Sequence, residues 1–218
     1  PWFRLHDPWV TREITVRDLL VHNSGLGLGA GDLLFVPRGS LSRKEMVKRL
    51  AHIKPARSFR SGYAYDNVLY AVAGQLIEEV SGKSWEDFMA RDVLKRGGMN
   101  TATANYEARL ATPNRAMPHA RIAGTVRGDG PLSMLDEREA ELGRAALPAG
   151  GLALSANDLA QWLKIQLGRG ALPGGGRLYS EAQANEMWKG VTLLPIGAPP
   201  PGPMAALTPK FSSYALGW

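Results

Sequence analysis

No cysteine occurs among the 218 residues of the chain. This absence excludes disulfides, thiolate metal sites and a cysteine nucleophile within these residues. It does not fix the compartment, because a chain without cysteine is stable in either redox environment. No apolar run approaches the ~18–20 residues that a membrane-spanning helix needs, and the first residues lack the pattern of a secretory signal peptide.

Clusters of metal-ligating or nucleic-acid-binding side chains are also lacking. His6, His52 and His119 are scattered, without a second histidine at helical spacing or a paired carboxylate, so we expect no metal site. The net charge is +6, but Arg and Lys are mixed with acids, as in LSRKEMVKRL, and form no stripe with aromatic residues. We therefore expect a solvated basic surface and no nucleic-acid partner.

Several helices can be predicted from their first residues, in a chain whose composition is that of a globular protein. A Ser or Thr precedes an acid by three residues at four places: Thr15 with Asp18, Ser42 with Glu45, Ser84 with Asp87, and Ser155 with Asp158. This spacing is typical of a helix start. Ser180 begins a further predicted helix. Leu159, Trp162 and Leu163 form the expected buried stripe of the helix after Ser155.

Strand patterns are few. Any strand between residues 100 and 148 should be short, because the segment is long and irregular. The proline-rich stretch 193–209 should lack regular structure, since proline fixes φ and removes a hydrogen-bond donor. Only the final FSSYALGW has a strand pattern, so the chain is predicted to be mainly helical.

The stretch 59–80, FRSGYAYDNVLYAVAGQLIEEV, combines a loop with the most apolar helix of the sequence. The first turns from Val68 are apolar nearly all round, which predicts burial on most sides. Gly74 lies inside this helix and should permit close approach of another element. Tyr65 and Asn67 lie immediately before the N-terminus of this predicted helix. Taken alone, they are explained by an Asn67 cap and a packed Tyr65 with a satisfied hydroxyl.

The order of several segments adds a resemblance. DPWVTREITVRDLLVHNSGLG, FRSGYAYDNVLYAVAGQLIEEVSGKSWEDF, PAGGLALSANDLAQWL and YALGW follow one another along nearly the whole chain. In this order they resemble the serine β-lactamase and penicillin-binding protein superfamily, specifically the class C β-lactamase-related esterases and D-amino peptidases. The resemblance implies an α/β (α+β) β-lactamase/transpeptidase-like fold.

The resemblance also implies roles for individual residues. The chemistry would be acyl transfer through an acyl-enzyme, without a cofactor. Tyr65 would relay a proton, while Asn67 would hold the catalytic lysine and donate to the substrate. Gly150 and Gly151 would border the substrate pocket, although they can also be a simple turn before the Ser155 helix. Asp66 is expected to point outward or to cap the helix.

The segment HNSGLG contains a serine that loosely resembles a nucleophile. The first glycine of the G-x-S-x-G elbow is absent, and a predicted helix precedes Ser24 where the elbow needs a strand. We therefore expect no nucleophilic role for Ser24, and the family resemblance implies that the segment is a structural turn near the cleft. His22 is then expected to be either a histidine at the helix C-terminus or a buried packing histidine, and not a base.

Two motifs of the superfamily are missing from the 218 residues. No serine is followed three residues later by lysine, and neither Lys-Thr-Gly nor His-x-Gly occurs. In the family these motifs lie before Tyr-x-Asn and after the strand that ends in LGW. We therefore expect residues 1–218 to be an internal part of one domain, lacking most of its antiparallel sheet and inactive alone.

Three functional interpretations stay open. The first is a serine hydrolase acting on an ester, an amide or a D-amino acid peptide, with a small molecule or peptide as substrate. The second is a non-catalytic binding or sensor protein that kept the cleft and lost the nucleophile. The third, a basic helical interaction module, requires Tyr65 and Asn67 to be coincidental. The family resemblance suggests a bacterial periplasmic or secreted protein.

Overall fold

The helices expected from capping residues are present in a computed structural model of the chain. The structure describes residues 2–122, 124–126, 128–136 and 142–218. Reciprocal capping boxes begin three helices: α2 (Val16–Leu20), α3 (Arg43–Arg49) and α8 (Ala156–Leu167). Side-chain caps from Ser84 and Ser180 begin α5 (Trp85–Phe88) and α9 (Glu181–Met187). These five predicted starts are confirmed, because each depends only on residues three positions apart.

The other helical segments are short, apart from α4. The remaining α-helices are α1 (Pro8–Glu13), α4 (Val68–Ser81), α6 (Tyr106–Ala111) and α7 (Leu147–Gly150). A π-helical stretch, Met89–Lys95, continues α5, and 3₁₀ turns occupy Asp32–Leu34, Leu50–His52, Arg144–Ala146 and Gly202–Leu207. The turn at Gly202–Leu207 corrects the expectation for 193–209. A proline in its first turn is tolerated, because the missing N–H has no partner there.

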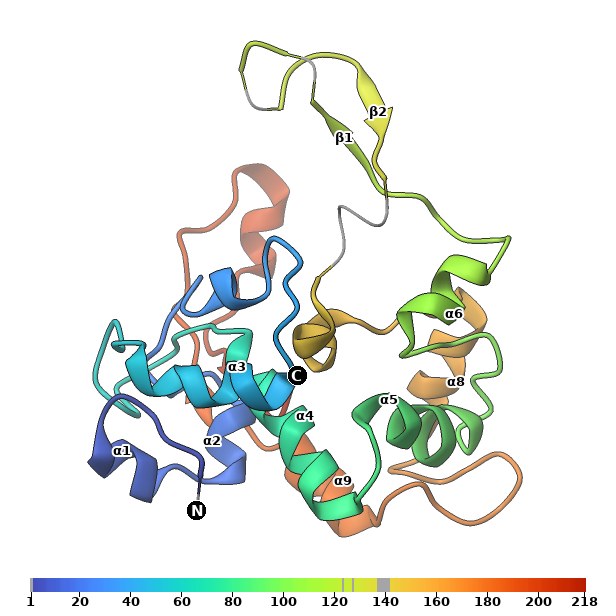
Figure 1. Cartoon of the computed structure of the whole chain (residues 1–218), viewed down its shortest axis with the longest axis horizontal. Coiled ribbons are helices and arrows are strands. Elements are labelled where there is room, and N and C mark those ends of the chain that lie inside the picture. Colours follow the sequence, from blue (N-terminus) through green and yellow to red (C-terminus); the bar gives the residue numbers. More distant parts are fainter. Residues whose placement is uncertain (1, 123, 127, 137–141) are drawn as a thin grey trace.

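Helix α4 is the centre of the fold and contacts α2, α3, α5 and α7 (Figure 1). Its first turns are buried, as predicted, with Val68 and Leu69 fully inaccessible. A Cβ added at Gly74 would lie 2.2 Å from Cγ of Pro148 in α7, so glycine is what permits this close approach. The helix ends at Ser81, and the next residue, Gly82, takes the left-handed conformation with φ of 67°.

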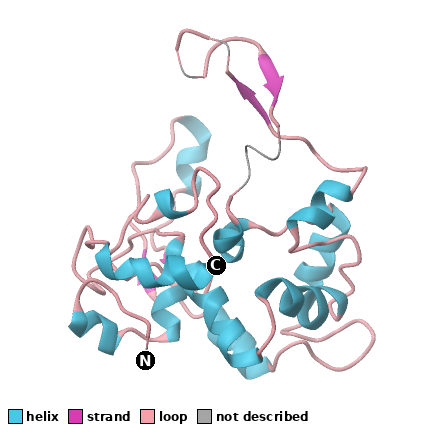
Figure 2. Ribbon diagram, in the orientation of Figure 1, coloured by secondary structure: helices cyan, strands magenta, loops and turns pink. Residues whose placement is uncertain are grey.

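Two small antiparallel sheets are described. One pairs β1 (His119–Arg121) with β2 (Leu132–Met134), and the other pairs β3 (Thr192–Leu193) with β4 (Ser213–Tyr214). Figure 1 shows the β1–β2 hairpin extending away from the helices, and Figure 2 shows how little of the chain is strand. The mainly helical character and the short strands are confirmed.

The predicted buried stripe of α8 is wrong. Leu159 and Leu163 are each 47% exposed, whereas Ile165 is fully buried. The turn after the π-helical stretch determines which side of α8 is buried. Asp158 of α8 accepts a hydrogen bond from the Thr101 backbone at 3.4 Å, and Ile165 of α8 packs near Gly97. Local periodicity could not identify this distant partner.

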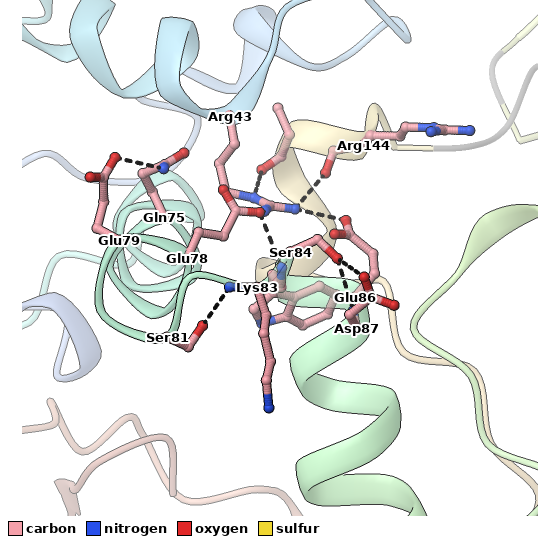
Figure 3. A network of polar contacts seen from close by, with 12 residues as sticks. Arg43, Gln75, Glu78, Glu79, Ser81, Lys83, Ser84, Glu86, Asp87 and Arg144 are labelled. Atoms are coloured by element: carbon pink, nitrogen blue, oxygen red, sulfur yellow. Dashed lines mark hydrogen bonds and ion pairs between the residues drawn. The ribbon is translucent and has the colours of Figure 1, made fainter.

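A buried arginine joins α3 to three other elements (Figure 3). The Arg43 side chain is only 6% exposed and forms ion pairs with Glu78 of α4 and with Glu86 of α5, the latter at 2.9 Å. Its guanidinium also donates to the backbone carbonyls of Ala145 and Arg144, each at 3.2 Å. One side chain therefore satisfies acceptors from α4, α5 and the 3₁₀ turn before α7.

Candidate active site

Tyr65 and Asn67 lie together at the start of α4. The Tyr65 hydroxyl donates to Oδ1 of Asn67 at 3.0 Å. The Asn67 amide then points its Nδ2 toward the Asp32 carboxylate, with 3.3 and 3.4 Å to the two oxygens. Tyr65 as a whole residue is 38% exposed. Asp32 was not predicted, because no pattern connects residues 35 positions apart.

Asp66, and not Asn67, caps α4. Oδ1 of Asp66 accepts from the Leu69 backbone N–H at 3.0 Å, and Oδ2 accepts from the Ser24 hydroxyl at 3.0 Å. Asn67 makes no capping hydrogen bond, so the interpretation of Asn67 as the cap is wrong. The cap predicted for Asp66 is confirmed, but its side chain is buried and does not point outward. Because Asp66 supplies the cap, the Asn67 amide is left for other partners.

Burial changes the ionisation of Asp66. Loss of solvation raises the pKa of its carboxyl to about 6, and the nearby negative charge of Asp32 adds to this rise. The hydrogen bonds from Leu69 and Ser24 act in the opposite direction and lower the pKa, but they do not outweigh burial. The Asp66 carboxyl is therefore shielded from solvent, and its hydrogen bonds with Leu69 and Ser24 hold it in place.

The His22 ring packs against the ring of Tyr65. The ring is buried, and its Nδ1 accepts from the Asp66 backbone N–H at 3.2 Å. Its ring lies 4.6 Å, centroid to centroid, from the ring of Tyr65. Three further tyrosine rings surround it at 5.0–5.6 Å: Tyr63, Tyr70 and Tyr214. Burial lowers the pKa of His22 to about 4, so the ring is neutral at pH 7 and acts in packing, as predicted.

The loop before Tyr65 is fastened to α2 by an ion pair. Arg60 donates to both carboxylate oxygens of Asp18, from Nε at 3.0 Å and from a terminal nitrogen at 2.7 Å. Arg60 has φ of 57°, a left-handed conformation that is unfavourable for a residue with a Cβ. The Asp18 carboxylate also accepts from Thr15 and from Asn23. The two-point ion pair stabilises this strained backbone.

The Asp18 contacts predict a pH-dependent stability. Burial would raise the pKa of Asp18, but the hydrogen bonds from Arg60 and its other donors lower it from 3.8 to about 2. A depressed pKa stabilises the fold above the unfolded-state value, and this contribution, about 2 kcal/mol, is lost as the pH falls from about 4 to 2.

We therefore expect Asp18→Asn to be destabilised by about 2 kcal/mol at pH 6 and to approach the parent chain at pH 2. Urea denaturation at both pH values measures this difference. Asp92, paired with Lys83 on the surface, provides the control, because Asp92→Asn should change stability by less than about 1 kcal/mol at either pH. An equal deficit of Asp18→Asn at pH 6 and pH 2 would contradict the argument.

Ser24 is used structurally. It is buried, its hydroxyl donates to Asp66, and its oxygen accepts from the Leu26 backbone N–H at 3.1 Å. Ser24 also lines a hollow of about 440 Å³, whose lining does not include Tyr65 or Asn67. The interpretation of HNSGLG as a turn agrees with these contacts.

The two predicted pocket glycines lie at the end of α7. Gly150 is the last residue of this helix and Gly151 follows it. A Cβ built at Gly150 would lie 3.8 Å from Leu142, and one at Gly151 would lie 2.4 Å from the Leu147 side chain. The described contacts do not bring either glycine to the Tyr-x-Asn pair, so their role in substrate binding stays a prediction.

Within the described ranges, no group of three or more His, Asp or Glu side chains is arranged to hold a metal ion. The helices in the part of the chain that the structure describes are too short or too polar to cross a bilayer.

The fold and the site together define a class. The helices packed around α4 and the two small antiparallel sheets are consistent with part of an α/β fold of the β-lactamase-like type. The profile of the family described as Beta-lactamase matches residues 4–206, and the chain belongs to this family. The fold class and the resemblance are thereby confirmed.

Known relatives cover the chain almost completely. The unguisins hydrolase of Aspergillus campestris is 24% identical over 99% of the chain, and penicillin-binding protein 4 of Amycolatopsis lactamdurans is 28% identical over 84%. The structure of a D-stereospecific amidohydrolase from Streptomyces sp. superposes with a TM-score of 0.66, at 21% identity over 99% of the chain and 58% of its own. The chain spans 37% and 46% of the lengths of the first two relatives.

Proposed function

We propose that the whole protein to which these residues belong is a serine hydrolase that works through an acyl-enzyme. The observation that carries this proposal is the geometry at the start of α4. Tyr65 is partly exposed and hydrogen-bonded to Asn67, while a different residue, Asp66, supplies the helix cap. A purely structural turn would not need a second polar pair in addition to its cap.

The proposed reaction uses a serine and a lysine outside these 218 residues. In acylation the serine oxygen bonds to the substrate carbonyl carbon, the bond to the leaving oxygen or nitrogen breaks, and the serine proton ends on the leaving group. Water then releases the acyl group. Tyr65 fits the proton relay because its oxygen has lone pairs that can accept a hydrogen bond, so it can take up one proton as it gives its own proton to another group. Asn67 holds the tyrosine and has a second amide hydrogen for the substrate.

The proposed substrates are esters, amides and D-amino acid peptides, either small molecules or peptides. Support comes from the relatives, which are named as a hydrolase of unguisins and as a D-stereospecific amidohydrolase. Fold alone does not choose among these substrates.

A non-catalytic binding or sensor protein is the second candidate function. The 218 residues contain no Ser-x-x-Lys, which is also what a binding or sensor protein without a nucleophile would show. Such a protein would keep the Tyr-x-Asn geometry and bind its ligand without forming a covalent bond.

Intact-mass spectrometry distinguishes the two functions. The whole protein, incubated with p-nitrophenyl acetate or benzylpenicillin, should gain the mass of one acyl group on a serine. Residues 1–218 alone should gain none, because the nucleophile is proposed to lie outside them. An unchanged mass of the whole protein, together with no turnover of ester or amide, would overturn the hydrolase proposal and favour the binding protein.

A further inference from the structure

The hollow that Ser24 lines is a concave feature separate from the Tyr-x-Asn pair. It encloses about 440 Å³, and its lining includes neither Tyr65 nor Asn67. This volume falls within the range of about 300–1,000 Å³ that is typical of small-molecule sites. The proposed acyl transfer does not use the hollow, so its walls and charges require an explanation of their own.

Two segments that are distant in the sequence form walls of the hollow. One is residues 5–10, which lead into α1, and the other is residues 53–59, in the loop before α4. Backbone hydrogen bonds hold the second segment, because the Gly25 carbonyl accepts from the N–H groups of Ala56 and Arg57 at 2.8 and 3.1 Å. A Cβ at Gly25 would lie 2.3 Å from the Arg57 carbonyl oxygen, so glycine permits this approach. The hollow is therefore preformed by backbone contacts.

The apolar part of the lining can cover the body of a ligand. Leu5, Val10 and Leu26 are buried members of this lining. Trp9 and Phe59 form an edge-to-face pair with ring centroids 5.9 Å apart, and Trp9 is 53% exposed. Aromatic rings supply a large apolar contact area. The lining therefore suits a ligand with an aromatic or alkyl body.

The lining also contains one acid and one arginine, and their surroundings differ. The Asp7 carboxylate caps α1, where Oδ1 accepts from the Trp9 backbone N–H at 2.7 Å. The Arg57 guanidinium donates from one terminal nitrogen to the Tyr63 carbonyl at 3.1 Å. A guanidinium carries further N–H donors, and the ion pairs between residues that the structure describes do not include Arg57. The hollow therefore presents a cation that can accept an anionic partner.

We propose that this hollow binds a carboxylate with an aromatic or alkyl body, and that Arg57 pairs with the carboxylate group. A planar guanidinium matches a carboxylate in two-point geometry, and such charge-assisted hydrogen bonds are stronger than neutral ones. The Trp9–Phe59 pair would contact the apolar body of the ligand. The site takes no part in acyl transfer, so the proposal does not depend on the proposed function.

Fluorescence titration of the whole protein with 1-pyrenebutyrate tests the proposal, with 1-pyrenebutanol as the uncharged probe. We expect the acid to bind more tightly than the alcohol, and Arg57→Gln to weaken binding of the acid alone, by about 10-fold. Unchanged binding of the alcohol shows that the hollow of this variant is still folded. Trp9→Ala should weaken both probes by about 5-fold, because it removes aromatic contact.

Two controls separate the pairing of charges from less specific effects. Lys54→Gln removes a positive charge from the same segment, but Lys54 is not part of the lining, so both affinities should change by less than about 2-fold. Raising the salt concentration from about 50 to 500 mM should weaken binding of the acid to the parent protein, because salt screens exposed charges. Arg57→Gln should lose most of this salt dependence.

Several results would overturn the proposal. Equal loss of both probes in Arg57→Gln would show that Arg57 only holds the loop through the Tyr63 carbonyl. Loss of binding in Tyr65→Phe would place the probes at the candidate active site, since Tyr65 does not line the hollow. Tighter binding of the alcohol than of the acid would indicate an uncharged ligand. Absence of binding of either probe would show that the whole protein has no such site.

Discussion

Replacement of Tyr65 by phenylalanine in the whole protein should lower kcat about 10²- to 10⁴-fold, the range typical of a lost acid–base group. Phenylalanine keeps the ring that packs 4.6 Å from His22 but removes the hydroxyl that donates to Asn67. The ring packing should hold the loop in place, so KM should change little. Steady-state kinetics on an ester and an amide measure both constants.

Tyr63→Phe is the matched control for this experiment. Tyr63 belongs to the same loop and packs against the same histidine ring, at 5.6 Å, but its hydroxyl is not part of the contact with Asn67. We expect a change in kcat of less than about 3-fold, since no proton-transfer group is lost. Similar losses for the two variants, or full activity of Tyr65→Phe, would remove Tyr65 from the proton relay.

Replacement of Arg43 by methionine should destabilise the chain by about 3 kcal/mol, because a charged group is removed from a buried network while its partners remain. Glu86 and Glu78 would lose their ion pairs, and the Ala145 carbonyl would lose a donor (Figure 3). The two glutamates keep about a quarter of their side-chain surface exposed, so water limits the loss. Chemical denaturation measures the free energy of unfolding.

Lys44 is the neighbouring control. It forms an ion pair with Glu79 at 2.9 Å, but its side chain is 47% exposed, and such surface pairs contribute less than about 1 kcal/mol. Lys44→Met should therefore unfold close to the parent midpoint. Arg43→Lys should recover only part of the stability, since lysine cannot supply the planar fork that reaches four acceptors. Equal stability of Arg43→Met and Lys44→Met would show that the network contributes little.

Local features could be predicted from the sequence, and features that join distant segments could not. The Ser155–Asp158 capping box and the close approach at Gly74 follow from spacing and residue type. Tyr65 and Asn67 became candidates only through the order of family segments, because two residues at fixed spacing recur by chance. Asp32 contacts Asn67 from 35 residues away, and no periodicity indicates such a contact.

The buried stripe of α8 shows the same limit inside a single helix. Spacing allowed several faces of this helix to be buried, and the face that contains Ile165 is selected by contact with the turn at Gly97. The cap of α4 was also not predictable from the sequence, because Asp66 and Asn67 are both good capping residues by type. Asp66 is the residue that is buried, because Ser24 from a distant segment donates a hydrogen bond to its carboxyl.

The hydrogen bond from Ser24 to Asp66 has a consequence for the order of folding. The two residues are 42 positions apart, as are Asp18 and Arg60, so the turn that presents Tyr65 closes long loops before its contacts form. Loop closure carries an entropy penalty, and contacts of high sequence separation slow folding. The capped helices can form early, whereas the turn that contains Tyr65 can form only after residues 18–24 have come into contact with it. An isolated peptide of residues 59–81 would therefore contain the motif without its geometry.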